Sequence, residues 1–314
     1  MIKPKCLRPG ARLAVISPAS IPDEQKVELG LERLRSLGYD PVLMPSALAK
    51  GPLNYAGDAL ARAADLHAAF ADPAFDAVLC TRGGWGTAEL LPLLDADLVR
   101  RNPKPFLGFS DPTTLHLWFA QVCGLHTFYA PMVSPDFARG STLEEGVDLY
   151  SWRSALEQTE PWLLNEQQGM RVLMPGAAVE GTLVGGCLAL LTESLGTPYD
   201  LQPPPGGLIL FLEEVNTRAY QWDRQLLHLR YAGLLDRVRG IVFGDMQQCC
   251  SAPGEAEVIE ETLRYNLRDF TGPVSIGLQS GHVDTPNVTL PLGVRVRLEC
   301  TSAASLHILE SAVE

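Results

Sequence analysis

The sequence has few of the features that place a protein in a membrane, an oxidising compartment or a metal-binding class. It contains no apolar run long enough for a membrane span. Its seven cysteines are scattered, odd in number and without Cys-x-x-Cys spacing, so we expect neither a disulfide framework nor a zinc cluster. The basic N-terminus lacks the apolar core and cleavage site of a signal peptide, which predicts a cytoplasmic location.

Positive charge is also scarce. Lys and Arg number 25 against 37 Asp and Glu, for a formal net charge of −12. This imbalance argues against nucleic acid or an anionic membrane surface as the partner. Neither a Gly-x-Gly-x-x-Gly dinucleotide loop nor a His-Glu-x-x-His metal motif occurs, so we expect no cofactor and no metal. The net charge does not exclude a small-molecule cleft, which can be locally neutral or basic.

The 314 residues suffice for two domains, and the first half alternates strand-like and helical patterns. This alternation predicts an α/β domain over residues 1–160, with a parallel sheet covered by helices on both faces. Residues 161–175 are polar without a clear period and are predicted to be a linker, which leaves 176–314 as a second domain. The predicted strands of the first domain are 12–17, 41–44, 76–80, 106–108 and 125–130, and its helices are 25–37, 58–70, 87–94, 113–123 and 141–156.

The second domain cannot be folded from its pattern alone. Its small-residue segment 181–191 leads into an apolar stretch, and strand-like and helical segments then alternate. The predicted strands are 208–212, 240–244, 274–276, 288–292, 294–300 and 305–309, and the predicted helices are 220–231 and 255–267.

The chain is organised around the stretch Phe106–Phe119, in which a short apolar run ends, Ser110 follows and a helical pattern begins. A serine at a tight strand-to-helix turn lies over the carboxyl edge of the sheet, as a mounted nucleophile does. Ser110 and Asp111 are also good helix-capping residues, with Pro112 near the first helical position. Both interpretations stand for this stretch taken by itself.

A glycine-bearing turn, Thr81–Gly86, follows the third predicted strand. Adjacent glycines allow positive φ or close approach of the backbone to a bound group, and such loops lie at the ligand-binding edge of an α/β sheet. An ordinary tight turn is the alternative. Trp85, between glycines, is better suited to a pocket wall than to a core.

An acid pair and a loop histidine occur in the second half. Glu213 and Glu214 end an apolar strand, where burial is costly unless each carboxylate has a partner; otherwise they face solvent or cap the next element. Because side chains alternate along a strand, only one of the two can face a given partner. His282 is the one histidine of six in a polar, glycine-bearing loop, where it suits a base near neutral pH or a solvent-exposed role.

These motifs, in their order and spacing, resemble the LD-carboxypeptidase family of serine peptidases, which includes muramoyltetrapeptide carboxypeptidases and microcin C self-immunity peptidases. The segments that carry the resemblance are Arg82–Gly86, Gly108–His116, Gly185–Leu188, Leu212–Val215 with Tyr220–Arg224, and Gly281–Asn287. The resemblance implies a Rossmann-like or flavodoxin-like N-terminal domain, a smaller β-rich α/β C-terminal domain, and a homodimer.

The resemblance also implies roles for individual residues. Ser110 is the expected nucleophile, His282 the base and Glu213 the orienting acid, with Glu214 as the alternative acid. Such a glutamate would hold the imidazole in the tautomer that accepts the serine proton. The expected oxyanion hole consists of the backbone N–H groups of Gly84 and Asp111, and the expected substrate-binding residues are Arg82, Gly83, Trp85, Gly186 and Cys187.

The resemblance leaves the substrate open. The first expectation is an LD-peptide bond that ends in a D-amino acid, such as the D-Ala of a murein tetrapeptide, in peptidoglycan recycling. The second is an acyl-sulfamoyl adenylate or aminoacyl-nucleotide amide, against which Trp85 would stack. A third possibility, from another class, is a non-catalytic binding module in which Ser110 only caps a helix. Cys187 stands where the family often has Asn, and a thiol cannot replace an amide in hydrogen bonding.

Overall fold

The computed structural model describes two compact units of the chain. The first comprises Met1–Thr159, Thr285–Gly293 and Ser311–Glu314, and the second comprises Glu160–Asp284 and Val294–Glu310. The polypeptide therefore returns to the first unit after the segment that contains His282. The described residues are 1–202, 204, 206–246, 249–250 and 254–314.

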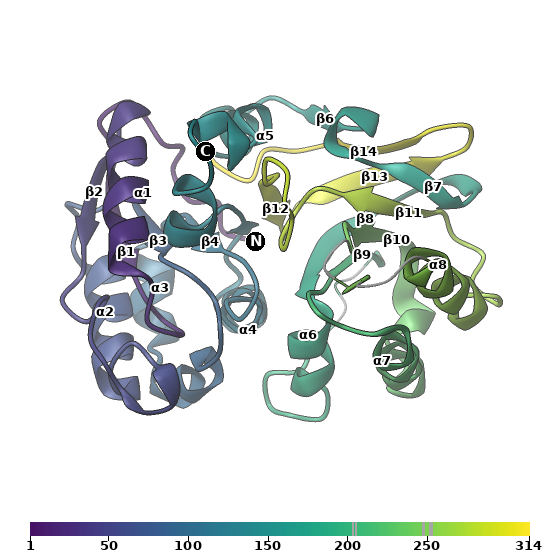
Figure 1. The fold of residues 1–314 in the computed structure, drawn as a ribbon, viewed down its shortest axis with the longest axis horizontal. Helices are drawn as coiled ribbons and strands as arrows, with labels where there is room; N and C mark the ends of the chain where they lie inside the picture. Colours follow the sequence, from purple (N-terminus) through teal and green to yellow (C-terminus); the bar gives the residue numbers. More distant parts are fainter. Residues whose placement is uncertain (203, 205, 247–248, 251–253) are drawn as a thin grey trace. The chain divides into compact units, whose positions relative to one another are not determined.

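The first unit contains a six-stranded sheet with the order β12-β5-β4-β3-β1-β2 (Figure 1). Strands β1 to β5 are parallel, and β12 is antiparallel to β5 at the edge. The order 2-1-3-4-5 is that of a flavodoxin-like doubly wound sheet, which confirms the predicted fold class. The strands are β1 (Arg12–Ile16), β2 (Asp40–Leu43), β3 (Ala77–Cys80), β4 (Phe106–Gly108), β5 (Thr127–Tyr129) and β12 (Leu290–Leu292).

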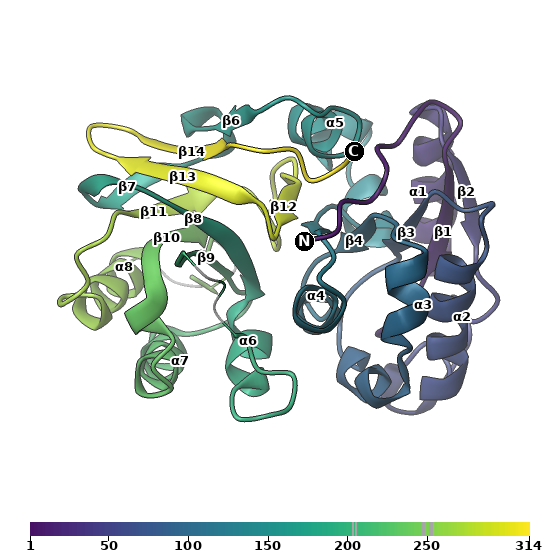
Figure 2. The same ribbon diagram turned by 180° about the vertical axis from the view of Figure 1, so that it is seen from behind.

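Helices cover both faces of this sheet, with α1 on one face and α2 and α3 on the other (Figures 1 and 2). Asp23 caps α1 by accepting the Lys26 N–H at 3.0 Å, and Asp58 caps α2 by accepting the Ala61 N–H at 2.7 Å. Such caps satisfy N–H groups that have no partner within the helix, which is why both helices begin there. The helices are α1 (Glu24–Ser36), α2 (Ala59–Ala71), α3 (Ala96–Arg101), α4 (Thr113–Trp118) and α5 (Leu149–Leu156).

Some predicted helices of this unit are shorter or differently wound. The segment after the glycine turn is a 3₁₀ helix, Thr87–Leu93, because Pro92 within it cannot donate to an α-helical ladder. The helix after Ser110 is α-helical only to Trp118 and continues as a π-helical turn. Of the predicted helix 141–156, the last part forms α5 and only a short 3₁₀ turn, Leu143–Glu145, precedes it.

The second unit contains an eight-stranded sheet with the order β6-β14-β13-β8-β9-β10-β11-β7. Its centre, β8 to β11, is parallel, and the flanking strands pair antiparallel. Helices α6 (Leu188–Ser194), α7 (Ala219–Tyr231) and α8 (Glu255–Asn266) connect the parallel strands. The strands are β6 (Trp162–Leu164), β7 (Arg171–Met174), β8 (Gly176–Cys187), β9 (Leu208–Glu213), β10 (Val238–Gly244), β11 (Val274–Leu278), β13 (Arg295–Cys300) and β14 (Ala304–Ile308).

The predicted linker 161–175 is wrong. It contains β6 and β7, which form the two edges of the second sheet. Edge strands of three or four residues are too short to show a hydrophobic period, so the sequence pattern could not reveal them. The predicted domain 176–314 also needs correction, because its residues 285–293 and 311–314 belong to the first unit.

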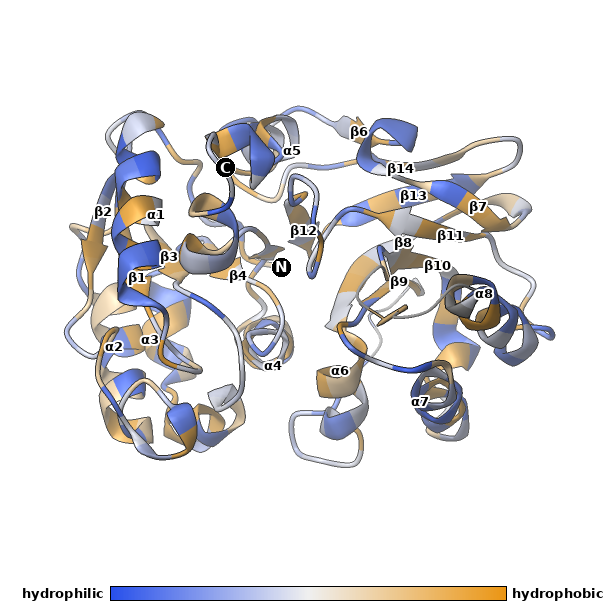
Figure 3. Cartoon of the chain, viewed as in Figure 1, coloured by the Kyte–Doolittle hydropathy of each residue, from blue (hydrophilic) through white to orange (hydrophobic). Residues whose placement is uncertain are grey.

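Strands β3 and β9, which lie in the interior of the two sheets, are fully buried. Figure 3 shows hydrophobic residues along the strands and hydrophilic ones on the outer surface of α1. Burial of each large apolar side chain contributes about 1.5–3 kcal/mol, so these strands are firmly held. The glycine turn follows β3 and Glu213 ends β9, so each is attached to a buried strand whose position is fixed by packing. No helix in the described ranges is long and apolar enough to cross a membrane.

Candidate active site

Ser110 follows β4 in a conformation that is unusual for a residue with a side chain. Its φ is +68°, in the left-handed region that costs a non-glycine residue about 1–2 kcal/mol. The first turn of α4 begins directly behind it, where the Thr113 N–H donates to the Ser110 carbonyl at 2.8 Å. A strained turn between a buried strand and a helix is the geometry of a nucleophile elbow.

Two buried side chains support this elbow. Tyr129, at the end of β5, accepts the Ser110 N–H on its phenol oxygen at 3.0 Å. His116, on α4, donates from Nε2 to the Gly108 carbonyl, 2.8 Å away. Burial lowers the pKa of His116 to about 4, so the ring is neutral and its Nε2 carries the proton. His116 therefore has a structural role. Together, Tyr129 from β5 and His116 from α4 stabilise the backbone around Ser110 in its strained conformation.

The glycine turn lies against Ser110. A Cβ placed on Gly83 would be 2.7 Å from the Ser110 Cβ and 2.9 Å from its Oγ, so only glycine fits. Gly84 has a φ of +116°, and a Cβ there would overlap the Ser20 hydroxyl. The predicted proximity of the turn and Ser110 at one sheet edge is therefore observed.

Asp111 links the strained turn at Ser110 to Thr87, the residue after the glycine turn. Its carboxylate accepts the Thr87 N–H at 2.9 Å, and its carbonyl accepts the Thr87 hydroxyl at 2.8 Å. Burial raises the pKa of the Asp111 carboxyl, and the bond from the Thr87 N–H opposes that rise. The two segments that contain the expected oxyanion donors are thus joined.

Arg82 and Trp85 occupy different environments in the turn. Arg82 is half-buried and donates to the Ile21 carbonyl at 3.2 Å. Trp85 is 52% exposed, and its backbone N–H donates to the Ser20 hydroxyl at 3.3 Å. Its indole is therefore the part of the turn that can still cover a bound group.

Glu213 and His282 form a hydrogen-bonded pair in the second unit. Glu213 is fully buried at the end of β9, and its Oε2 lies 2.8 Å from His282 Nδ1. The same oxygen accepts the His282 backbone N–H at 3.0 Å. Because a carboxylate can only accept, Nδ1 carries the ring proton and the lone pair of Nε2 becomes the basic site. The predicted acid and base are therefore in contact.

Glycines make room for this pair. Gly281 has a φ of +96°, and a Cβ on it would lie 2.7 Å from both Cγ and Oε2 of Glu213. On the neighbouring strand, a Cβ on Gly244 would lie 2.7 Å from the Glu213 Cβ. A larger residue at either position would displace the Glu213 side chain. Glycine at both positions therefore leaves the space that this side chain occupies.

Glu214 faces the junction of β8 and α6. Its carboxylate accepts the Cys187 thiol at 2.9 Å, the Ala189 N–H at 2.8 Å and the Thr217 hydroxyl at 2.8 Å. Burial, with both nearby carboxylates, raises the pKa of the Cys187 thiol, which keeps it a donor. Because side chains alternate at the end of β9, the two carboxylates have different partners. Glu213 contacts His282, and Glu214 binds the Cys187 thiol and the Ala189 N–H at the start of α6.

Of the expected substrate-binding residues in this unit, Cys187 is buried and engaged with Glu214. Gly186 pairs with Leu212 in the register of β8 and β9, one residue before Glu213. Gly185 has a φ of +148°, and a Cβ on it would overlap the Phe211 carbonyl. The glycine pair therefore allows close strand packing beside the acid.

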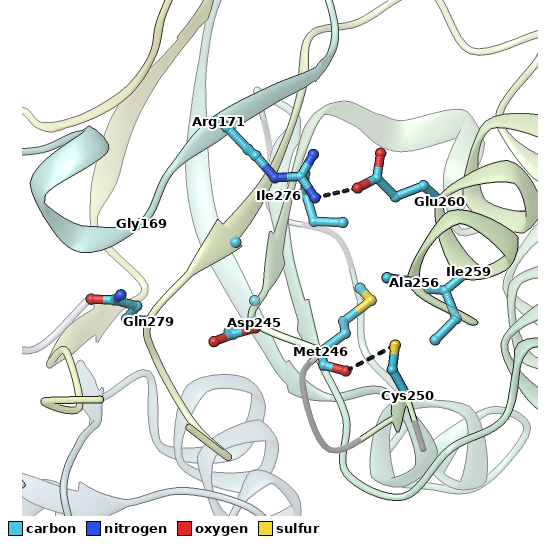
Figure 4. Close-up of a pocket in the computed structure, with 12 residues that line it drawn as sticks. Gly169, Arg171, Asp245, Met246, Cys250, Ala256, Ile259, Glu260, Ile276 and Gln279 are labelled. Atoms are coloured by element: carbon cyan, nitrogen blue, oxygen red, sulfur yellow. Dashed lines mark hydrogen bonds and ion pairs between the residues drawn. The ribbon is translucent and has the colours of Figure 1, made fainter. Parts of the chain in front are cut away.

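A cavity of about 470 Å³ lies near the ends of β10 and β11 (Figure 4). Its lining includes Gly244, which packs on Glu213, and Gln279, three residues before His282. Figure 4 shows the ion pair of Arg171 and Glu260 in its wall. Among the residues that the structure describes, no group of three His, Cys, Asp or Glu side chains could hold a metal ion.

Sequence reasoning missed Tyr129 as part of the site. Tyr129 lies in a buried strand 19 residues from Ser110, and nothing in its local sequence marks its hydroxyl as an acceptor. Ser110 belongs to the first unit, whereas Glu213 and His282 belong to the second.

Two family models match successive parts of this chain. Residues 13–130 match the LD-carboxypeptidase N-terminal domain, and residues 180–298 match the LD-carboxypeptidase C-terminal domain. The chain is 35% identical to a Bacillus subtilis protein named "Probable murein peptide carboxypeptidase", over 99% of this chain and 95% of that protein.

Solved structures of related proteins also resemble this chain over nearly its whole length. An MccF-like protein from Bacillus anthracis has a TM-score of 0.88 at 27% identity, covering 99% of this chain and 100% of that one. A muramoyltetrapeptide carboxypeptidase from Oxalobacter formigenes has a TM-score of 0.83 at 27% identity, covering 96% and 99%. These matches reject the non-catalytic binding module. The chain belongs to the LD-carboxypeptidase family and is a serine-type carboxypeptidase.

Proposed function

We propose that this enzyme hydrolyses an LD-peptide bond and releases the terminal D-Ala of a murein tetrapeptide, with Ser110, His282 and Glu213 as its catalytic triad. The observation that carries the proposal is the buried Glu213 carboxylate on His282 Nδ1 at 2.8 Å. That bond leaves Nε2 to accept a proton, and the strained turn at Ser110 suits the proton donor. A cytoplasmic role in peptidoglycan recycling, as a homodimer, is part of the proposal.

The proposed reaction has two stages. The Ser110 hydroxyl attacks the carbonyl carbon while His282 Nε2 takes its proton, and Glu213 stabilises the imidazolium that forms. The backbone N–H groups of Gly84 and Asp111 would stabilise the negative oxygen of the tetrahedral intermediate. Collapse breaks the C–N bond, and the departing D-amino acid takes the proton from the imidazolium. Water, activated by His282, then hydrolyses the acyl-enzyme and restores Ser110.

The murein substrate is favoured by the 35% identical relative, whose name refers to murein peptides. An aminoacyl-nucleotide amide is the second candidate, supported by the MccF-like neighbour and by the exposed indole of Trp85. An aromatic face in that position could stack on a base.

Incubation of the purified enzyme with L-Ala-γ-D-Glu-meso-diaminopimelate-D-Ala tests the proposal, with D-Ala measured by chiral chromatography. We expect D-Ala release from this peptide and none from the same peptide ending in L-Ala. Glutamyl sulfamoyl adenosine, tested in a separate assay, represents the second candidate substrate class. Hydrolysis of the nucleotide amide with no D-Ala release would reject the murein proposal in favour of the second candidate.

Tyr129→Phe is expected to lower kcat about tenfold, because it removes the acceptor that holds the Ser110 N–H in its strained turn. KM should change little, since the Tyr129 side chain is fully buried. The matched control is Tyr39→Phe, which removes a buried phenol bonded to Glu157 and Trp152 elsewhere in the same unit. If both variants kept the wild-type kcat, the support role of Tyr129 would be wrong.

A further inference from the structure

Arg62 is a buried cation beside the glycine turn. It lies in the first part of α2, and its side chain has no exposed surface. Burying a guanidinium costs several kcal/mol unless hydrogen bonds and opposite charge offset the loss of water. The partners of Arg62 therefore indicate what the side chain is for.

The guanidinium bridges two loops at the carboxyl edge of the first sheet. Its Nη1 donates to the Pro18 carbonyl after β1 and to the Gly86 carbonyl after β3, each at 2.8 Å. Its Nη2 pairs with Glu89 at 2.7 Å, and the group lies over the Tyr55 ring, 4.7 Å from the centroid. One rigid group thus holds both loop ends in fixed positions.

Thr81, at the start of the glycine turn, is held separately, because its N–H donates to the Ile16 carbonyl at 2.8 Å. In the Gly83–Gly86 part of the turn, the other hydrogen bonds among the described residues are longer than the bond from Arg62. The Ser20 N–H reaches the Gly83 carbonyl at 3.4 Å, and the Trp85 N–H reaches the Ser20 hydroxyl at 3.3 Å. The bond from Arg62 to the Gly86 carbonyl, at 2.8 Å, is shorter by about half an ångström. Gly86, which receives one of them, has a φ of +124° and ends the turn. Arg62 therefore makes the shortest hydrogen bond to the Gly83–Gly86 part of the turn, between the bonds that hold Thr81 and Thr87 at its two ends.

A stability role would not require arginine here. The Nε of Arg62 has no hydrogen-bond partner among the described residues, so the burial of this cation is incompletely offset. Replacing buried ionic groups by well-packed apolar ones is often neutral or stabilising. What an apolar side chain cannot supply is directed bonds to two carbonyl groups at once.

We propose that Arg62 is a positioning residue that sets the distance between the Gly84 N–H and Ser110 by holding the glycine turn at Gly86. This inference rests on the proposed function, because it takes Gly84 as an oxyanion donor. Gly83 already touches Ser110, so a displaced turn would move the donor relative to the reacting carbonyl. A misplacement of about 1 Å in such a site can lower the rate about 100-fold.

Two variants test the role. Arg62→Met removes both bonds, and we expect kcat to fall about 30- to 100-fold while KM stays within about threefold. Arg62→Lys keeps the charge and one nitrogen for the two carbonyls, but it lacks the planar group and the second nitrogen that pairs with Glu89. We therefore expect kcat to recover to about a tenth of wild type. The Lys variant decides the question if the Met variant does not fold.

Lys104→Met is the matched control. Lys104 is a buried cation whose Nζ donates to the Ala69 carbonyl at 2.8 Å and to the Asp72 carbonyl, both at the other end of α2. Its loss should lower the urea midpoint of unfolding with kcat within about twofold of wild type, since it does not contact the turn. An equal loss of kcat in this variant would assign the effect of Arg62 to the stability of α2 and overturn the proposal.

Labelling of Ser110 by a fluorophosphonate separates this inference from the choice of substrate, because the phosphonyl oxygen occupies the same oxyanion site. We expect the labelling rate to fall in parallel with kcat in both Arg62 variants. Wild-type rates of turnover and labelling in both variants would overturn the positioning role and leave the proposed function intact. If the wild type is labelled but releases no D-Ala, the positioning role of Arg62 is judged from the labelling rates alone: slower labelling of the Arg62 variants would support it, and wild-type labelling rates would overturn it. Neither labelling nor turnover in the wild type would reject both proposals.

Discussion

Ser110→Ala is expected to lower D-Ala release by about 10⁴- to 10⁶-fold, the loss typical of removing a triad nucleophile. The change deletes one oxygen from a residue whose backbone is already held by the Tyr129 phenol, so the fold should be unaffected. Alanine also tolerates the positive φ of this position about as well as serine does. The expected result is therefore loss of kcat with an unchanged urea midpoint of unfolding.

Covalent labelling checks the same prediction by another route. A fluorophosphonate should add one phosphonyl group to the wild type, located at Ser110 by mass spectrometry. The adduct should be absent from Ser110→Ala and form very slowly in His282→Ala, which lacks the base. Labelling of Ser110 at the wild-type rate in His282→Ala would contradict the assignment of His282 as the base.

Glu213→Gln is expected to reduce kcat by about 10³- to 10⁴-fold with little change in KM. The amide keeps the volume of the carboxylate but has no negative charge to stabilise the imidazolium. It can also present its NH₂ group to His282 Nδ1, which favours the tautomer with the proton on Nε2. In that tautomer the ring cannot accept the Ser110 proton.

Glu214→Gln is the control for this variant, because it makes the same chemical change one residue away. Glu214 is also buried, but its carboxylate holds the Cys187 thiol, the Ala189 N–H and the Thr217 hydroxyl. We expect a lower urea midpoint of unfolding and a kcat within about threefold of wild type. Equal losses of kcat in the two variants would mean that the acid has been assigned incorrectly.

The parts of the fold that the sequence predicted are those with strong local signals. The parallel strands of the first unit are short, buried and separated by amphipathic helices, and their predicted positions agree with β1 to β5. The short edge strands β6 and β7 lie in the segment that the sequence predicts as a linker, because their pairing partners are distant in the sequence. The sequence predicts a strand at 288–292, which contains β12. Its membership of the first unit has no local signal, since it follows from the pairing of β12 with β5.

The candidate site also has features that the sequence can predict and features that it cannot. Ser110, the glycine turn, the acid pair and His282 could each be identified from residue type and position at the end of an apolar run. Which acid meets His282 could not, because Glu213 and His282 are 69 residues apart and the choice depends on which face of β9 each side chain occupies. Cys187 shows the same limit, since its thiol contact with Glu214 spans 27 residues.

The sequence by itself determined the α/β class of the first unit, the family and the short list of candidate active-site residues, because these depend on local patterns and motif spacing. Only the tertiary structure assigned Glu213 to His282, Tyr129 to the Ser110 N–H, and Arg62 to the Gly86 carbonyl. These are hydrogen bonds between residues distant in the sequence, each requiring a particular distance and direction. Such geometry is created when the sheets form, and no local stretch of the chain encodes it.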